Sequence, residues 1–132
     1  MFALYSRRVY GNQIVFDQAD FFQPDEYTRV VGLTVSDLGC ELYFNNQLMS
    51  WSFVSGVGVP DAQVASGKIY WMEIAGSPGR YSMRWRPSAV GYWRMLITYP
   101  AGTQIVGREY DVIPPPNADQ GLKTSFLKPG CA

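Results

Sequence analysis

Apolar and polar residues alternate with a period of two along several short segments of the chain, and turn-forming residues separate these segments. A period of two places successive side chains on opposite faces of a strand, so each segment is predicted to be a strand with one buried face. No segment has a convincing helical period longer than two turns. We therefore predict seven strands, over residues 29–35, 40–44, 48–54, 68–74, 80–86, 91–99 and 105–113.

Alternation also predicts which side chains point into the core. The residues predicted to face inward include Val31, Leu33, Val35, Cys40, Leu42, Phe44, Met49, Trp51, Phe53, Tyr70, Met72, Ile74, Tyr81, Met83 and Trp85. The residues predicted to face outward include Tyr43, Trp71, Ser82, Arg84 and Tyr92. Turns are predicted at 45–46, 55–66 and 76–79, where Gly, Pro, Asn and Asp gather.

Seven short alternating strands favour an all-β fold, an immunoglobulin-like two-sheet sandwich of antiparallel strands. A Greek-key barrel is the alternative. The cysteine pair of antibody domains is absent, although Trp51 sits where a third-strand core tryptophan is expected. The inward residues are bulky, so two sheets could bury a sound core without a disulfide.

The two ends of the chain differ from this central part. We predict an N-terminal arm over 1–27 with one strand candidate at 13–16, the sandwich over 28–113, and an extended C-terminal tail over 114–132. The tail begins with three prolines, which cannot donate ladder hydrogen bonds. Its apolar residues are too widely spaced to form a core, so it is either a disordered terminus or an arm that orders on a neighbouring subunit. These residues are Leu122, Phe126 and Leu127.

The last two predicted strands allow a prediction of register. With a turn at 100–103, antiparallel pairing sets Trp93 opposite Tyr110 on the inner face. The same register sets Arg94 opposite Glu109 on the outer face. Apolar pairs inside and an oppositely charged pair outside stabilise a sheet.

Arg108 conflicts with this register, because strict alternation points its side chain inward beside Met95. A β-bulge at Gly107 would turn Arg108 outward, and glycine tolerates the backbone angles of a bulge. We therefore predict such a bulge.

Composition supports one globular domain of strands and turns. The chain has 132 residues, of which 15% are aromatic, together with 13 glycines and 9 prolines. Eleven basic and eleven acidic residues give a net charge of zero, which argues against nucleic acid or an anionic membrane as partner. The N-terminus does not have the pattern of a signal peptide, and no apolar run is long enough to cross a bilayer.

The sequence offers little catalytic chemistry. Histidine is absent, which removes the commonest general base and metal ligand. Cys40 and Cys131 lack the spacing of a zinc site, and we expect both to stay reduced. Acidic residues cluster only at 17, 20, 25 and 26, where a solvated loop is favoured over a calcium site. We predict no enzymatic activity, no cofactor and no metal.

The outward aromatic residues are the candidate binding residues. Trp71, Tyr92 and Tyr43 are predicted to lie on solvent-facing sides of strands, with Arg84 about opposite Trp71. A cation–π pair that merely covers the sheet is one interpretation. We favour a protein contact surface, because Trp, Tyr and Arg dominate protein interfaces. Stacking on a sugar ring is a further alternative.

Several segments resemble immunoglobulin-like domains of virion proteins in tailed bacteriophages. The resemblance covers roughly residues 20–113. It is carried by Gly91-Tyr-Trp-Arg-Met-Leu-Ile-Thr-Tyr-Pro-Ala-Gly102, Arg108-Glu-Tyr-Asp-Val112, Pro78-Gly-Arg-Tyr-Ser-Met-Arg-Trp85 and Phe22-Gln-Pro-Asp25.

This resemblance implies a non-enzymatic structural protein of the phage particle, at the tail or at a fibre attachment. It implies other virion proteins as partners, a homo-oligomeric state, and assembly into the virion in the host bacterial cytoplasm. A capsid decoration protein and a carbohydrate-binding module are the alternatives.

Overall fold

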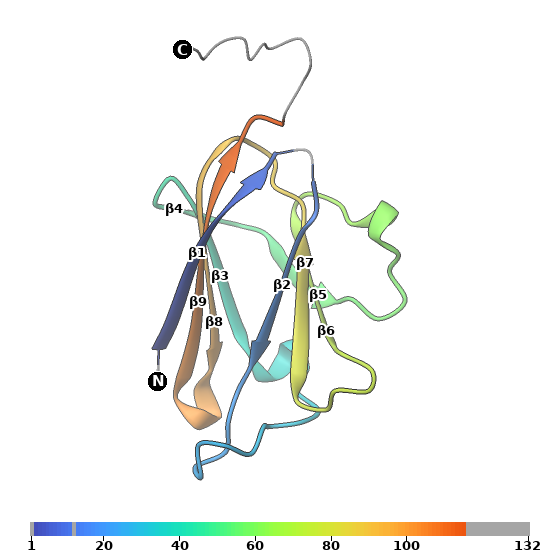
Figure 1. Cartoon of the computed structure of the whole chain (residues 1–132), viewed down its shortest axis with the longest axis vertical. Helices are drawn as coiled ribbons and strands as arrows, with labels where there is room; N and C mark the ends of the chain where they lie inside the picture. The colour runs from blue at the N-terminus through green and yellow to red at the C-terminus, as the bar shows by residue number, and fades with distance from the viewer. Residues whose placement is uncertain (1, 12, 116–132) are drawn as a thin grey trace.

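The computed structural model describes residues 2–11 and 13–115, which form nine β-strands and three short 3-10 helices (Figure 1). The strands are β1 (Phe2–Tyr10), β2 (Val15–Asp20), β3 (Gly39–Phe44), β4 (Gln47–Met49), β5 (Ser52–Ser55), β6 (Lys68–Glu73), β7 (Arg80–Trp85), β8 (Gly91–Tyr99) and β9 (Gln104–Ile113). The 3-10 helices are η1 (Val35–Asp37), η2 (Asp61–Gln63) and η3 (Pro100–Gly102). The described chain contains no helix long and apolar enough to span a membrane.

The strands form two sheets that pack face to face. One sheet has five strands in the order β1-β9-β8-β3-β4, and the other has four in the order β2-β7-β6-β5. The β3-β8-β9 group faces the β2-β7-β6 group, as the CFG and BED strands do in immunoglobulin domains. The predicted all-β, immunoglobulin-like sandwich is therefore confirmed, with β1–β9 and β5–β6 as parallel pairs among otherwise antiparallel ones.

Aromatic side chains from both sheets fill the centre of the sandwich. Trp85 of β7 and Trp93 of β8 are fully buried, and their ring centroids lie 5.3 Å apart. Trp51 packs edge-on against both rings, at 5.9 Å and 5.5 Å. The predicted inward positions of Tyr81, Met83 and Trp85 are confirmed, because all three are fully buried.

The predicted register of the last hairpin is also confirmed. Trp93 pairs with Tyr110 and Arg94 pairs with Glu109, and η3 makes the turn between the strands. The predicted bulge at Gly107 is wrong, because the pairing continues through it without an extra residue.

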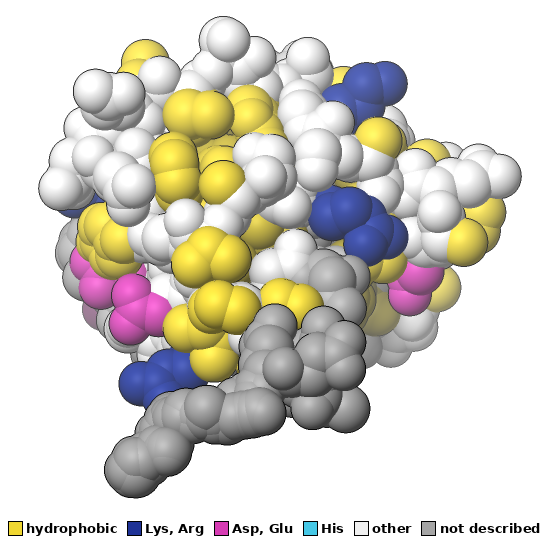
Figure 2. All heavy atoms as spheres, turned by 90° about the horizontal axis from the view of Figure 1, so that it is seen from above, with side chains coloured by type: hydrophobic (Ala, Val, Ile, Leu, Met, Phe, Trp, Pro, Cys, Tyr) yellow, Lys and Arg dark blue, Asp and Glu magenta, His cyan; other side chains and the backbone are white. Residues whose placement is uncertain are grey.

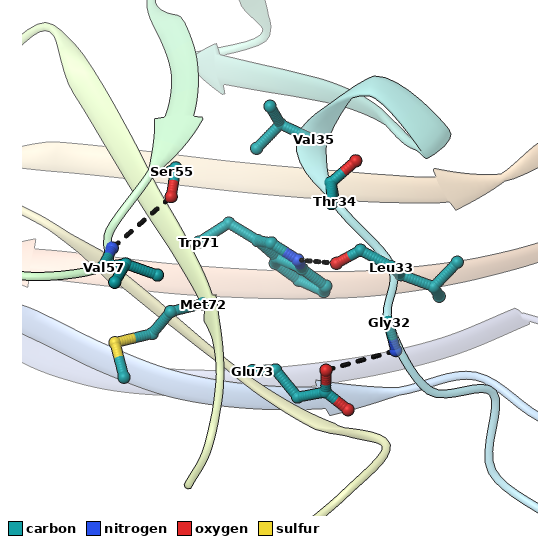
Figure 3. Close-up of a pocket in the computed structure, with 9 residues that line it drawn as sticks. All are labelled: Gly32, Leu33, Thr34, Val35, Ser55, Val57, Trp71, Met72 and Glu73. Atoms are coloured by element: carbon teal, nitrogen blue, oxygen red, sulfur yellow. Dashed lines mark hydrogen bonds between the residues drawn. The ribbon is translucent and has the colours of Figure 1, made fainter.

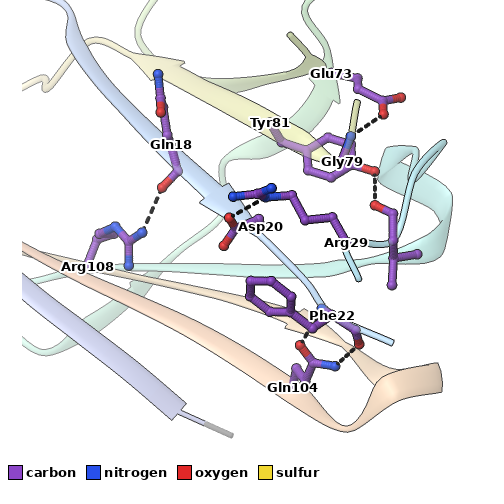
Figure 4. A network of polar contacts seen from close by, with 10 residues as sticks. Gln18, Asp20, Phe22, Arg29, Glu73, Gly79, Tyr81, Gln104 and Arg108 are labelled. Carbon is purple, nitrogen blue, oxygen red and sulfur yellow. Dashed lines mark hydrogen bonds and ion pairs between the residues drawn. The ribbon is translucent and has the colours of Figure 1, made fainter. Parts of the chain in front are cut away.

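Arg108 therefore points inward, where its Nη1 donates to the carbonyl of Gly107 on its own strand and the opposite sheet supplies two further partners. Its Nη2 donates a hydrogen bond of 2.7 Å to the carbonyl of Gln18 in β2 (Figure 4). Its Nε lies 3.5 Å from the carboxylate of Asp17, which also accepts a 2.9 Å hydrogen bond from the hydroxyl of Tyr110. A buried guanidinium is tolerated where such partners replace water.

The first 27 residues differ from the predicted arm, because they supply one strand to each sheet. β1 lies parallel to β9 along its whole length, and the strand candidate at 13–16 is observed as the longer β2. Arg7 of β1 donates to the carbonyl of Phe16 of β2, so a guanidinium links the two sheets at this side of the sandwich.

The predicted strand over 29–35 is wrong. Only an isolated bridge between Phe22 and Arg29 forms, and Gly32 has a φ of 76°, which interrupts an extended strand. Val31, predicted to face inward, is 58% exposed, whereas Leu33 is buried as predicted. The Tyr81 hydroxyl holds this segment on the core, because it accepts from the Leu33 N–H and donates to the Val30 carbonyl.

The predicted strand over 48–54 is divided between the two sheets. β4 pairs with β3 in one sheet, and β5 pairs with β6 in the other. The inward positions within this segment are retained, because Met49, Trp51 and Phe53 all pack against the core.

The tail positions Leu122, Phe126 and Leu127 lie outside the described residues, as does Cys131.

Candidate functional site

The outer face of the four-stranded sheet is covered by the chain itself around Arg84, whereas Phe16 on the neighbouring strand β2 is 47% exposed. Arg84 points outward from β7 as predicted, but it is only 7% exposed because the segment 55–66 folds over it. Its guanidinium donates to the carbonyls of Gly56 and Val59 and to the carboxylate of Asp61. Arg84 therefore anchors a loop, and the prediction that it forms part of a binding surface is not supported.

Trp71 lies on the inner face of β6, so its predicted outward position is wrong. It is 2% exposed, pairs with Met83 rather than Arg84, and stacks on the ring of Tyr81 at 4.7 Å. Its Nε1 donates to the Leu33 carbonyl. The face of β6 is the reverse of the predicted one: Ile69 also faces the core, while Tyr70 lies beneath the covering loop, close to Gly56.

A small pocket opens beside Trp71, with a volume of about 230 Å³ (Figure 3). Mainly apolar side chains line it, including Leu33, Val57 and Met72. Glu73 is the one ionisable residue in the lining, and its two carboxylate oxygens accept from the backbone N–H groups of Gly32 and Gly79. The pocket therefore offers no pair of groups suited to acid–base catalysis.

The outer face of the five-stranded sheet carries the remaining predicted aromatic residues. Register places Tyr43, Arg94 and Glu109 side by side on β3, β8 and β9. We call this surface the open sheet face, and define it by Glu41, Tyr43, Leu48, Tyr92, Arg94, Leu96, Glu109 and Asp111. Of the four sandwich residues proposed from the sequence as binding residues, it brings Tyr43 and Tyr92 together and leaves Trp71 and Arg84 elsewhere.

Polar contacts fix the aromatic rings of the open sheet face. The Arg94 guanidinium carbon lies 4.7 Å from the ring centroid of Tyr43, whose hydroxyl donates to Glu41. The Tyr92 hydroxyl donates a hydrogen bond of 2.5 Å to Oε2 of Glu109. These two hydrogen bonds are the main reason why the pKa values of Tyr43 and Tyr92 are raised.

Arg94 is the residue that the sequence analysis did not single out as a binding residue. Its Nε is buried, and within residues 2–11 and 13–115 no acceptor is placed to take its hydrogen bond. Its outward position two residues after Tyr92 was the signal in the sequence, since Arg and Tyr are both enriched in protein interfaces.

Three of the four clustered acidic residues at 17, 20, 25 and 26 are held by other residues of the chain. Asp17 binds Tyr110, Asp20 pairs with Arg29 at 3.0 Å, and Asp25 accepts from the backbone of Tyr27 and Thr28. Glu26 adopts a left-handed φ of 71° in the same turn. Within the described residues, no group of His, Cys, Asp and Glu side chains is arranged to hold a metal ion.

Apolar side chains also gather at one end of the sandwich, where β1 and β9 finish (Figure 2). Tyr10 and Val90 are exposed there, and Gly11 lies against Val90 and Ile113. The chain leaves the described region at this end through Pro114 and Pro115.

No protein-family model matches the chain, and no curated protein matches it. Solved structures of immunoglobulin domains align over most of it. The titin M10–obscurin-like 1 Ig complex aligns at 12% identity over 88% of this chain and 92% of that chain, with a TM-score of 0.38. The M1 domain of titin aligns at 11% identity over 84% and 89%, with a TM-score of 0.37. The titin M3 domain aligns at 15% identity over 83% and 88%, with a TM-score of 0.35. Because these scores are low, the fold assignment rests on the strand order described above.

Proposed function

We propose that this chain is a non-enzymatic structural protein that binds neighbouring proteins through the open sheet face. The main observation is that this sheet face presents Tyr43, Tyr92 and Arg94 outward, whereas on the opposite outer face the loop 55–66 covers Arg84. Tyr and Arg supply large contact area and strong hydrogen bonds, and they recur at the energetic centres of interfaces.

The contacts that the buried and half-buried ionisable side chains make support a non-catalytic role. Four of them, Arg84, Arg108, Asp17 and Glu73, hold loops or sheets together through hydrogen bonds. Catalysis needs a nucleophile or an acid–base pair around a site that a substrate can reach.

The resemblance of the sequence to immunoglobulin-like virion proteins supports a setting in a tailed-phage particle, with other virion proteins as partners. Tail or fibre attachment is the favoured position, and capsid decoration is the alternative. A carbohydrate-binding role is less well supported, because Trp71, one of its two stacking platforms, is buried.

Binding to particle proteins tests the proposal. We expect the full chain to occur in purified virions and to bind at least one particle protein in a mixing experiment read by size-exclusion chromatography. Replacing Tyr43 and Tyr92 by Ala should weaken that binding at least tenfold, which corresponds to about 1.4 kcal/mol. The control is Tyr27→Ala, because Tyr27 is 79% exposed on a loop outside the open sheet face. Absence from virions, together with no contact to any particle protein, would overturn the proposal.

A further inference from the structure

We infer that the open sheet face binds a second copy of this chain, with a two-fold axis that runs parallel to β8 and β9 and midway between them. This inference rests on the proposed function and names one partner for the same surface. Its first basis is the arrangement of charge across β8 and β9, where Arg94 lies directly opposite Glu109.

A half-turn about this axis generates the second copy and places β8 of each copy against β9 of the other. It therefore sets Arg94 of each copy against Glu109 of the other, and Tyr92 against Asp111. Packed sheets twist by about 30° relative to each other, but pairs beside the axis stay opposed. Two-fold contacts are self-complementary, so each of these pairs occurs twice.

Arg94 and Glu109 both have capacity for a partner. The Nε of Arg94 is buried and so closed to a second copy, and Tyr43 covers one face of the guanidinium, which leaves the terminal nitrogens of Arg94 to meet a carboxylate of the partner. Glu109 uses Oε2 to accept from Tyr92, which leaves Oε1 to accept from another donor. A charge-assisted hydrogen bond across the interface would satisfy both groups.

The charges of the open sheet face disfavour an acidic partner, because one cation, Arg94, lies among the anions Glu41, Glu109 and Asp111. The two-fold axis sets each Arg94 against Glu109 of the other copy, so the one cation of the face meets an anion twice in the dimer.

The size of the overlap suits a weak dimer. The axis sets β8 against β9 and β1 against β3, and strands about 4.8 Å apart with about 3.3 Å per residue then overlap over roughly 500 Å² per copy. Weak, transient interfaces bury less than about 600 Å² per partner.

Charge complementation between two variants tests the inference, with sedimentation equilibrium of the full chain as the measurement. In Arg94→Glu the new carboxylate faces Glu109 of the other copy, and in Glu109→Arg the new guanidinium faces Arg94. We expect each variant alone to dimerise at least tenfold more weakly than the wild type. Mixing the two variants should restore dimerisation, because each then meets opposite charges on its partner.

Two controls keep the outcome clear. Lys68→Glu makes a charge reversal of the same size on the other sheet and should leave the dimer unchanged. Urea unfolding of each variant checks that it remains folded.

A wild type that stays monomeric up to sub-millimolar concentration would overturn the inference, and so would a mixture that dimerises no better than the single variants. If such a monomer still bound particle proteins through Tyr43 and Tyr92, the proposed function would stand with a different partner. A wild type that neither dimerised nor bound particle proteins would overturn both the inference and the proposed function.

Discussion

The guanidinium of Arg108 lies between the two sheets, where a charge without partners would cost several kcal/mol. It contacts Gln18 and Asp17 across the gap, and Asp17 also holds the hydroxyl of Tyr110. We expect Arg108→Met to lower the free energy of unfolding by about 3 kcal/mol, because it leaves the carboxylate of Asp17 without its cation in a largely buried place.

Urea unfolding followed by circular dichroism measures this loss. Arg80→Met is the matched control, because Arg80 is exposed on β7, and its effect should stay within about 0.5 kcal/mol. An Arg108→Met protein with the unfolding midpoint of the wild type would contradict the role assigned to this network.

Cys40 packs against the core from β3, and burial raises the pKa of its thiol to about 12. Because the thiolate is the reactive form, we expect alkylation by iodoacetamide at pH 8.5 to be about a thousandfold slower in the folded protein than in guanidinium. The measurement uses Cys131→Ser, so that Cys40 is the sole thiol, and counts adducts by mass spectrometry. Equal rates in the two states would show that the thiol is accessible.

The raised pKa of Tyr110 predicts how the stability of the protein changes at alkaline pH. Burial, and then the charge of Asp17, raise the pKa of Tyr110 well above its ordinary value. As the pH rises above about 10, unfolded Tyr110 loses its proton while folded Tyr110 keeps it, so stability falls by up to about 1.4 kcal/mol per pH unit. Urea midpoints at pH 8 and at pH 10.5 measure this slope. We expect Tyr110→Phe to make it shallower, and an unchanged slope would assign the effect to other groups.

At the scale of elements, the β3–β4 hairpin depends on two left-handed residues. Asn45 and Asn46 have φ values of 48° and 69°, as the predicted turn requires. We expect Asn46→Val to destabilise the protein by about 1–2 kcal/mol, because a β-branched residue is strained in this region. Asn46→Gly should stay within about 0.5 kcal/mol of the wild type. Thermal unfolding compares the two, and equal melting temperatures would argue against strain at this turn.

Elements were predictable from the sequence where polar and apolar residues strictly alternate. Residues 80–86 alternate cleanly, and so β7 and its inward side chains were predicted correctly. Residues 69–72 are Ile-Tyr-Trp-Met, a run without polar positions, and alternation cannot decide which face is inner. The reversed face of β6 follows from that run, and with it the wrong position of Trp71.

The pairing of strands, and the loops that cover a sheet face, were harder to predict. β1 has Ser6-Arg7-Arg8 at its centre and lies at the edge of its sheet, so its apolar pattern is weak although it pairs with the whole of β9. The position of Arg84 was predicted correctly, but its burial depends on the loop 55–66 folding back over β7. Contacts of this kind join residues about 25 apart in the sequence, and the alternation of polar and apolar residues within one strand cannot predict them.

At the scale of the whole molecule, the candidate binding features lie in different places. The open sheet face covers the side of one sheet, whereas the chain leaves the sandwich at the end where β1 and β9 finish. A face suits a two-fold contact between copies, and a segment that departs from one end suits contact with a further neighbour. These two roles can therefore be separated by experiment.

Deleting residues 117–132 separates them. All nine strands lie within residues 2–113, so we expect the truncated protein to keep the unfolding midpoint of the wild type. We expect it also to keep dimerisation through Arg94 and Glu109. If the proposed function holds, its binding to particle proteins should weaken, because Phe126 and Leu127 are apolar side chains that could fill a partner's pockets. Sedimentation equilibrium and mixing with particle proteins measure the two properties. Unchanged binding to particle proteins would show that the tail contributes nothing to assembly, and loss of the dimer would assign self-association to the tail instead of the open sheet face.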